Sequence, residues 1–204
     1  MNLLQTLNSP SCLSLFDFDL TLYDFSEISV LFSMHEPMNL FIQNQFEMSS
    51  LEANHTRQYL WKSYGTTLAG LRIEFDVNPD DFFDYIHHHE NIRHPAPNPA
   101  LNQFLTSLQS EKWIFTNGRR DWAELGTTKI GIRDHFDKII DLSDSNWVGK
   151  PHRSAYAMVQ GQVPPGKTVV FLDDSYDNLV MAKNFGWTTV WLRPSERGEG
   201  PFDY

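Results

Sequence analysis

The sequence predicts an α/β protein in which a parallel sheet has helices on both faces and is interrupted by an all-helical insertion. Short apolar runs that end in polar residues alternate with segments of helical periodicity, which is typical of a parallel sheet covered by helices. One long stretch after the first run breaks this alternation and contains only helical patterns. The 204 residues are enough for one such domain with a modest insertion.

The predicted strands are apolar throughout, as expected for strands buried on both faces of a parallel sheet. They cover residues 12–16, 112–115, 168–172 and 188–192, with a further short strand at 139–140. Segments with the apolar spacing of amphipathic helices lie between them. These predicted helices cover residues 99–110, 120–128, 153–160 and 176–184.

The insertion is expected to cover residues 24–98, which leaves residues 1–23 and 99–204 as the core. Its predicted helices cover residues 26–34, 37–46, 49–64 and 79–88. Ser49 or Ser50 can cap the third of these helices, and Asn78 followed by Pro79 marks the start of the fourth. The proline-rich segment Pro95–Pro99 is expected to form a stiff connector back to the sheet.

The composition is that of an ordinary globular protein and limits its partners. Hydrophobic residues make up 41% of the chain, and 26 acidic residues outnumber 16 basic ones, for a net charge of −10. This balance disfavours nucleic acid polymers and anionic membranes, which bind basic surfaces. Cys12 is the single cysteine and no stretch is long and apolar enough to span a membrane. The N-terminus lacks the basic residues of a signal peptide, so we expect a soluble cytoplasmic protein.

Polar side chains follow the predicted central strands and share one expected location. Ligands of open α/β sheets bind beyond the carboxyl ends of the strands. The polar residues at or just after the strand ends are Asp17, Asp19, Thr21, Thr116, Asn117, Asp173 and Asp174. Lys150 lies in the loop before the strand at 168–172. A single aspartate at a strand end is usually a turn or helix cap, but the whole set in this order favours a functional site.

Four carboxylates at one sheet edge repel one another, and a divalent cation resolves the conflict. Oxygen-only ligands favour Mg²⁺, which commonly binds substrate phosphate as well. Lys150, Asn117 and the hydroxyl groups of Thr21 and Thr116 can bind phosphate oxygens. The set therefore indicates phosphoryl transfer assisted by Mg²⁺, although the residues alone do not decide which aspartate attacks.

In these residues the sequence resembles the haloacid dehalogenase superfamily. Its four motifs are matched in order by Asp17-Phe-Asp19-Leu-Thr21, Phe115-Thr116-Asn117, Lys150-Pro151 and Phe171-Leu-Asp-Asp-Ser-Tyr-Asp-Asn178. Within the superfamily, the second aspartate is typical of phosphatases and phosphomutases, whereas the dehalogenases lack it and use no metal. A finer resemblance is to the pyrimidine 5′-nucleotidase-like branch. It is carried by Leu-Thr-Leu-Tyr23, by the segment from Tyr59 to Leu71, by Gly149-Lys150-Pro151-His152 and by Asn178, where other branches usually have aspartate.

The resemblance implies a Rossmann-like core with a helical cap and assigns roles to the site residues. Asp17 would attack the phosphate and form an aspartyl-phosphate, and Asp19 would act as general acid and then general base. Mg²⁺ would be held by Asp17, the backbone carbonyl of Asp19 and Asp174, with Asp173 as a further ligand or a neighbour of one. The residues that would hold the transferring phosphoryl group are Thr116, Asn117, Gly118 and Lys150.

The cap is expected to contact the leaving group of the substrate. The best candidate is the hydroxyl-rich turn Tyr64-Gly65-Thr66, which ends a predicted helix. Tyr59, Trp61 and Tyr64 could stack on a base, but the alternative is that they pack in the cap's own core or between the cap and the core. Three consecutive histidines, His87–His89, cannot all chelate one ion from a helix, so they are read as a solvated helix end.

The sequence thus predicts a Mg²⁺-dependent phosphomonoester hydrolase that acts on a small phosphorylated metabolite. A nucleoside monophosphate, with pyrimidines preferred, is the leading substrate. The alternatives are a sugar-phosphate phosphatase, a phosphomutase, or a catalytically idle protein that binds phospholigands on the same fold. The oligomeric state is left open.

Overall fold

The computed structural model describes residues 2–192 and 203–204 and consists of two compact units. The core unit comprises Met1–Phe25 and Pro95–Tyr204, and the helical unit comprises Ser26–His94. The expected boundaries, after residues 23 and 98, therefore differ from these by a few residues. Residues 193–202, which the sequence assigns to the core, lie outside the described residues.

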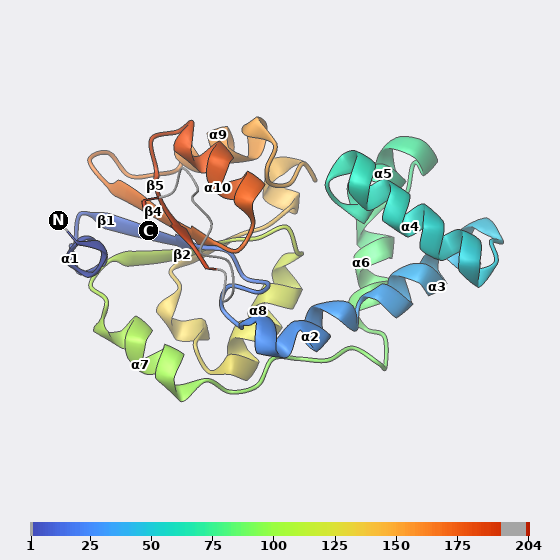
Figure 1. Ribbon diagram of the computed structural model, residues 1–204, viewed down its shortest axis with the longest axis horizontal. Helices are drawn as coiled ribbons and strands as arrows, with labels where there is room; N and C mark the ends of the chain where they lie inside the picture. The colour runs from blue at the N-terminus through green and yellow to red at the C-terminus, as the bar shows by residue number, and fades with distance from the viewer. Residues whose placement is uncertain (1, 193–202) are drawn as a thin grey trace. The chain divides into compact units, whose positions relative to one another are not determined.

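The core unit is built on a five-stranded parallel sheet in the order β3-β2-β1-β4-β5 (Figure 1). The strands are β1 (Cys12–Phe16), β2 (Glu111–Phe115), β3 (Lys138–Ile140), β4 (Thr168–Asp173) and β5 (Thr188–Trp191). Because β2 and β4 lie on opposite sides of β1, the chain reverses direction across the sheet between β1 and β4. Such a switch point leaves a crevice at the carboxyl ends of the two strands, where ligands bind.

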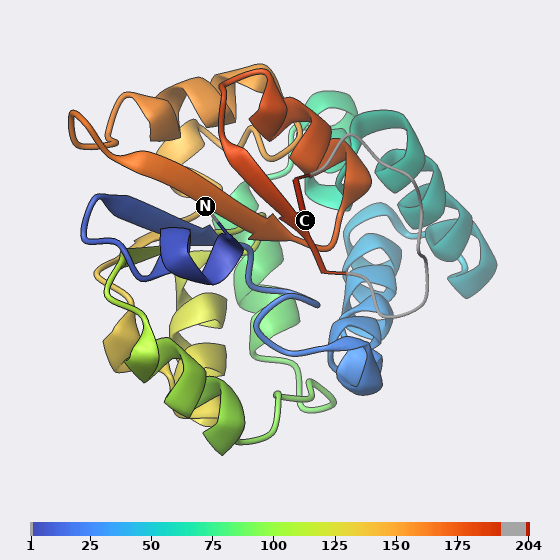
Figure 2. The same cartoon turned by 60° about the vertical axis from the view of Figure 1, so that its left-hand side comes forward.

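Helices cover both faces of this sheet, as predicted. Figure 1 shows α9 (Arg153–Gln160) and α10 (Tyr176–Lys183) on one face and α7 (Pro99–Ser107) and α8 (Arg120–Ile130) on the other, and Figure 2 shows the same layers from another side. The face under α9 and α10 is closed by buried aromatic side chains, which are Trp113, Phe115, Tyr156, Phe171 and Trp187. Burial of such large apolar side chains supplies most of the driving force that holds the helices on the sheet.

Two details of the core differ from the prediction. A short first helix, α1 (Leu3–Leu7), was not expected; Asn2 caps it and Leu7 is buried. The helix predicted at 99–110 ends at Ser107, because Leu108 has extended backbone and the Ser110 N–H donates to the carbonyl of Leu7.

The helical unit contains α2 (Ile28–Phe32), α3 (His35–Phe46), α4 (Ser50–Tyr64), α5 (Thr67–Phe75) and α6 (Pro79–His87), preceded by a 3-10 turn at Phe25–Glu27. Ser49 caps α4 through a reciprocal pair of hydrogen bonds with Glu52, and Asn78 caps α6. The helix α5 was not predicted; it begins at Thr67, directly after the cap residue Thr66. Gly70 lets it approach α4, because a β-carbon there would lie 2.6 Å from Leu60 Cδ2.

Tyr59 and Trp61 do not pack in the core of the helical unit, which was one of the alternatives for them. Their side chains are 53% and 58% exposed. Both lie on α4, whose buried positions are Ala53 and Leu60. The aromatic packing of the helical unit comes instead from contacts such as Phe41 against Phe82, with ring centres 5.3 Å apart.

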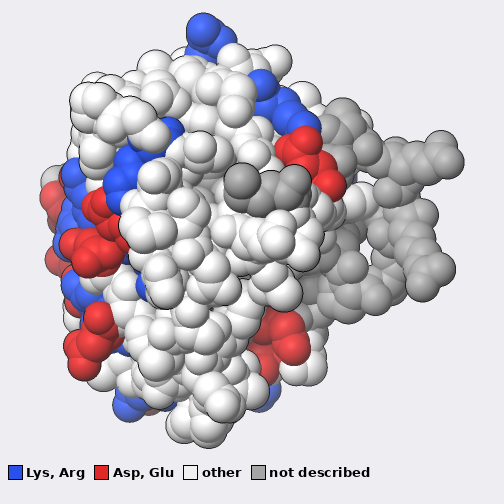
Figure 3. All heavy atoms as spheres, turned by 90° about the vertical axis from the view of Figure 1, so that its left-hand side faces the viewer, with Lys and Arg blue, Asp and Glu red and all other residues white. Residues whose placement is uncertain are grey.

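On the face shown in Figure 3, acidic and basic side chains are interspersed, and its described residues form no continuous basic patch. None of the helices in the described part of the chain combines the length and the apolar character that a bilayer crossing requires.

Candidate active site

The ends of β1 and β4 bring three carboxylates together at the switch point of the sheet. Asp17 continues the pairing of the two strands, since its backbone N–H donates to the Leu172 carbonyl at 2.9 Å. One oxygen each from Asp17, Asp173 and Asp174 lie within 4.8 Å of one another. Two strand ends that are distant in the sequence therefore form one acidic cluster.

Lys150 lies inside this cluster and bridges two of its members. Its ammonium nitrogen donates to Asp17 Oδ1 at 2.7 Å and to Asp173 Oδ2 at 2.9 Å. The side chain is buried, and the rings of Phe115 and Phe171 flank the ammonium at 5.1 and 5.3 Å. A buried ammonium needs such partners, because charge is costly away from water.

The charges in the cluster act on one another. Burial raises the pKa of the Asp17 carboxyl well above its ordinary value; Asp173 and Asp174 raise it further, and Lys150 opposes them. Burial by itself lowers the pKa of Lys150, but the carboxylates of Asp17 and Asp173 outweigh burial and raise it. Lys150 therefore stays protonated. A divalent cation beside Asp17 would favour the ionised form of the Asp17 carboxyl group.

Asp173 has its acceptor capacity filled by the protein. Its Oδ1 accepts from the Ser175 N–H at 2.7 Å, its Oδ2 accepts from Lys150, and Asn178 Nδ2 lies 3.0 Å from both oxygens. A carboxylate offers about four acceptor sites, so Asp173 is committed to placing Lys150. Asp17 and Asp174 are then the carboxylates better suited to bind a cation directly, and their all-oxygen chemistry fits Mg²⁺.

The Asp19 carboxylate is bonded by side chains outside this cluster. If the chain were extended, Asp17 and Asp19 would point to the same side, but the chain turns here. The Leu22 N–H donates to the Phe18 carbonyl, and Leu20 has a φ of 60°. The Asp19 Oδ1 atom accepts from the Tyr23 hydroxyl at 2.6 Å and from Trp122 Nε1 at 3.0 Å. Neither partner was predicted as a site residue, and the metal contact through the Asp19 carbonyl stays a prediction.

The loop after β2 is tied to the lysine loop by a reciprocal pair of hydrogen bonds. Asn117 Nδ2 donates to the Lys150 carbonyl at 2.9 Å, and the Lys150 N–H donates to Asn117 Oδ1 at 2.7 Å. The Asn117 side chain thus helps to place Lys150, and the expected contact of Asn117 with phosphate stays a prediction. Thr116 Oγ1 accepts from the Gly118 N–H at 2.9 Å, which closes the turn expected to hold the phosphoryl group.

Thr21, also predicted to bind phosphate, has a buried hydroxyl. Within the described part of the chain, it is the one buried side-chain polar atom that has no hydrogen-bond partner. A buried hydroxyl without a partner is costly, and a bound ligand would satisfy it.

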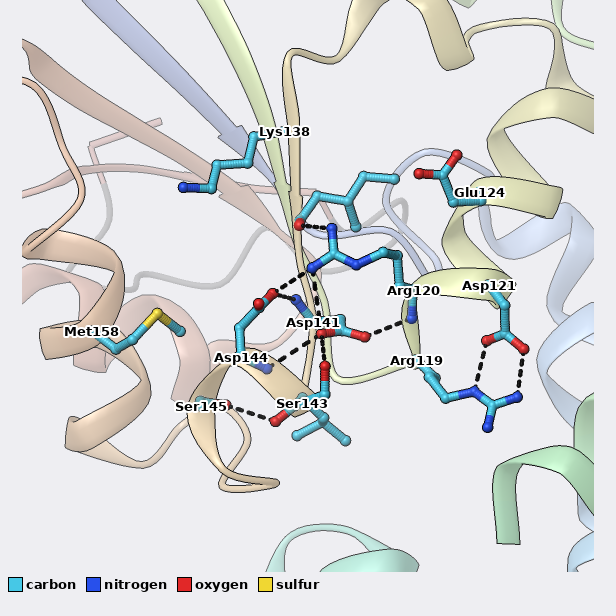
Figure 4. A network of polar contacts seen from close by, with 12 residues as sticks. Arg119, Arg120, Asp121, Glu124, Lys138, Asp141, Ser143, Asp144, Ser145 and Met158 are labelled. Carbon is cyan, nitrogen blue, oxygen red and sulfur yellow. Dashed lines mark hydrogen bonds and ion pairs between the residues drawn. The ribbon is translucent and has the colours of Figure 1, made fainter. Parts of the chain in front are cut away.

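A further strand-end carboxylate, Asp141, is structural (Figure 4). It is buried after β3 and accepts from the Arg120 N–H at 2.7 Å and from the Ser143 hydroxyl at 2.7 Å. The guanidinium of Arg120 donates to Asp144 at 2.7 Å. This network supports the loop after β2, since the next residue, Leu142, donates its N–H to the Gly118 carbonyl at 3.5 Å. Sequence reasoning missed it, although Asp141 directly follows the predicted strand at 139–140.

Comparison with known proteins places this site in a family. The sequence profile of the haloacid dehalogenase-like hydrolase family matches residues 14–192. The chain belongs to this family. The expected superfamily, the parallel-sheet core and its Rossmann-like character are therefore confirmed, whereas the nucleotidase branch is not specifically shown.

Individual relatives of this haloacid dehalogenase-like hydrolase are distant. Glyceraldehyde 3-phosphate phosphatase of Pyrococcus furiosus is 24% identical, over 93% of this chain and 83% of the relative. The structure of the HAD phosphatase from Thermococcus onnurineus has a TM-score of 0.62 and 21% identity, covering 95% of this chain and 92% of that one. HAD-hydrolase YfnB from Bacillus subtilis, bound to magnesium, has a TM-score of 0.61 and 16% identity, covering 94% and 92%.

The predicted substrate residues of the hydrolase's helical unit form the turn between α4 and α5. Gly65 ends α4 with a φ of 82°, and the Thr66 hydroxyl caps α5 by accepting from the Ala69 N–H at 3.0 Å. Tyr64 donates its hydroxyl to Glu74 at 2.7 Å, and this bond raises the pKa of Tyr64 to about 12. All three thus have structural roles in the turn, and their contact with a substrate stays a prediction.

Proposed function

We propose that this hydrolase is a Mg²⁺-dependent phosphomonoesterase that works through an aspartyl-phosphate on Asp17. The observation that carries the proposal is the buried Lys150 ammonium bonded to Asp17 and Asp173, with Asp174 in the same cluster. A phosphatase among the relatives and a magnesium-bound structure among the neighbours support it.

The proposed residues divide the work by their contacts. Asp17 and Asp174 would hold Mg²⁺ together with the Asp19 carbonyl, and the bound ion would neutralise charge on the phosphoryl oxygens. Lys150 adds a positive charge beside the attacking carboxylate, and Asp173 and Asn117 fix its position. The turn at Thr116–Gly118 would offer the Thr116 hydroxyl and the Asn117 backbone N–H to the phosphoryl oxygens.

The reaction has two steps that share one acid–base group. An Asp17 carboxylate oxygen attacks phosphorus, the bond to the leaving oxygen breaks, and Asp19 donates its proton to that oxygen. Water then attacks the same phosphorus and gives a proton to Asp19. The bond between phosphorus and Asp17 breaks, which releases inorganic phosphate and restores both carboxyl groups.

The proposed substrate is a small phosphorylated metabolite, with a pyrimidine nucleoside monophosphate first because of the motif resemblance. The second candidate is a sugar or triose phosphate, which the name of the Pyrococcus relative favours. A phosphomutase would pass the phosphoryl group to a sugar instead of water. An idle phospholigand-binding protein would not need Asp17, Asp19, Lys150 and Asp174 all to be present. The expected cytoplasmic location also stays a proposal.

A panel of phosphate esters tests the proposed function. The panel contains UMP, CMP, AMP, glyceraldehyde 3-phosphate and p-nitrophenyl phosphate, each with Mg²⁺ and with EDTA, and 2-chloropropionate as a probe for dehalogenation. We expect phosphate release that EDTA abolishes. Asp17→Asn should lower it by about 10⁴-fold or more, as loss of a nucleophile does. The matched variant Asp134→Asn changes an exposed carboxylate in the same unit and should leave it unchanged.

Two results would contradict the proposal. One is no phosphate from any ester with Mg²⁺ while the protein is folded by circular dichroism. The other is full activity of the Asp17→Asn variant, which would show that another residue attacks.

A further inference from the structure

We propose that Tyr23 and Trp122 are positioning residues that hold the Asp19 carboxylate, through its Oδ1 atom, in the orientation from which it acts. The inference rests on the proposed function, in which Asp19 is the acid and base. Both donors reach the same oxygen: Oδ1 accepts from the Tyr23 hydroxyl at 2.6 Å and from Trp122 Nε1 at 3.0 Å. Two hydrogen bonds from different elements to one oxygen fix the position of Oδ1 and, with it, the orientation of the carboxylate.

The two donors are themselves immobilised by packing. Tyr23 and Trp122 are 2% and 1% exposed, and both rings contact Phe18 edge to face, with centres 5.5 and 6.4 Å from it. Gly126 closes this packing, since a β-carbon there would lie 2.2 Å from Phe18 Cζ. Buried side chains packed this closely have one available orientation, so the carboxylate is held rather than free to rotate.

The second oxygen of Asp19 lies on the side of the phosphate-binding turn. Its Oδ2 is 3.8 Å from the position that a β-carbon on Gly118 would occupy. Gly118 follows Thr116 and Asn117, the residues proposed to hold the phosphoryl group. In the first step of the proposed reaction the bond from the Asp19 carboxyl group to its proton breaks as the proton moves to the leaving oxygen; in the second step the Asp19 carboxylate takes a proton from water. Proton transfer depends on this placement within hydrogen-bond reach.

The dependence on the leaving group distinguishes positioning from a structural role. An alkyl phosphate such as glycerol 3-phosphate leaves as a strongly basic alkoxide that needs the proton, whereas p-nitrophenolate leaves without one. We expect Tyr23→Phe and Trp122→Phe each to lower kcat/KM for glycerol 3-phosphate by about 10-fold, and the double variant to lower it by about 10²-fold. For p-nitrophenyl phosphate, kcat/KM should change by less than about threefold in each variant. Because kcat/KM reports only steps through the first irreversible one, the later attack of water does not affect it.

Two further variants complete the test. Asp19→Asn should show the same dependence on leaving group as the double variant, only stronger. Trp187→Phe is the matched control, because it removes an indole donor bonded to Gln160 elsewhere in the core unit, and it should affect both esters equally. Thermal unfolding of each variant checks that the fold is kept.

The outcomes separate the two proposals. If the wild-type protein hydrolyses both esters but the Tyr23 and Trp122 variants lose both rates equally, or neither, the positioning role is wrong and the proposed function stands. If the wild-type protein hydrolyses neither these two esters nor any other ester of the panel, the proposed function falls, and the positioning role with it.

Discussion

The candidate residues of the two units are held in different ways. In the core unit they bond one another: Lys150 bonds Asp17 and Asp173, and Asn117 bonds Lys150. In the helical unit they bond their own turn, as Thr66 caps α5 and Tyr64 bonds Glu74. A change in the core set therefore disturbs several charges at once, whereas a change in the turn disturbs one local contact. This difference is what one expects if the core supplies the reaction and the helical unit supplies selectivity.

The largest expected effect on stability comes from Lys150→Met. The change leaves Asp17 and Asp173 buried without their counter-charge, and breaking a buried pair costs about 3–5 kcal/mol of unfolding free energy. Urea unfolding in EDTA at neutral pH measures this loss. Mg²⁺ should restore part of it if the ion binds the same carboxylates, because it supplies positive charge there.

The matched control is Lys112→Met, which removes another buried lysine of the core unit. Its ammonium donates to the backbone carbonyls of Leu108 and Ser110. We expect a smaller loss, about 1–3 kcal/mol, with no restoration by Mg²⁺. Equal losses and equal responses to Mg²⁺ would show that the charges of the core site are not coupled as the distances indicate.

A smaller effect is expected from Gly149→Ala, which tests how tightly the lysine loop is seated. A β-carbon at this position would lie 2.6 Å from Asn117 Oδ1 and 2.9 Å from Leu142 Cδ2. Relieving such overlap costs about 1–3 kcal/mol and would shift the Asn117 side chain that holds Lys150. We expect reduced stability and a lower kcat. Gly161→Ala is the control, since the nearest atoms to a β-carbon there are at ordinary distances of 3.5 and 3.6 Å.

The same contrast explains what the sequence could predict. The convergence of Asp17, Lys150 and Asp174 was predictable, because parallel strands present their carboxyl ends at one edge and motif order indicates which strands are involved. The hydrogen bond from Trp122 to Asp19 was not, since it joins residues 103 positions apart through the docking of α8. The helix α5 was missed because Gly70 weakens its helical pattern, and its close packing against Leu60 and Tyr64, which explains that glycine, is visible only in the structure.

The smallest expected effect comes from Thr66→Ala in the helical unit. Loss of an N-cap costs about 1 kcal/mol, because one backbone N–H at the start of α5 loses its acceptor. The core carboxylates are untouched, so kcat for p-nitrophenyl phosphate should stay the same. If the turn contacts the natural leaving group, KM for the best ester of the panel should rise, and Thr66→Ser, which keeps the hydroxyl cap, should restore it. A fall in kcat for every ester would instead show that this turn supports the reaction itself, and the division of work between the two units would then fail.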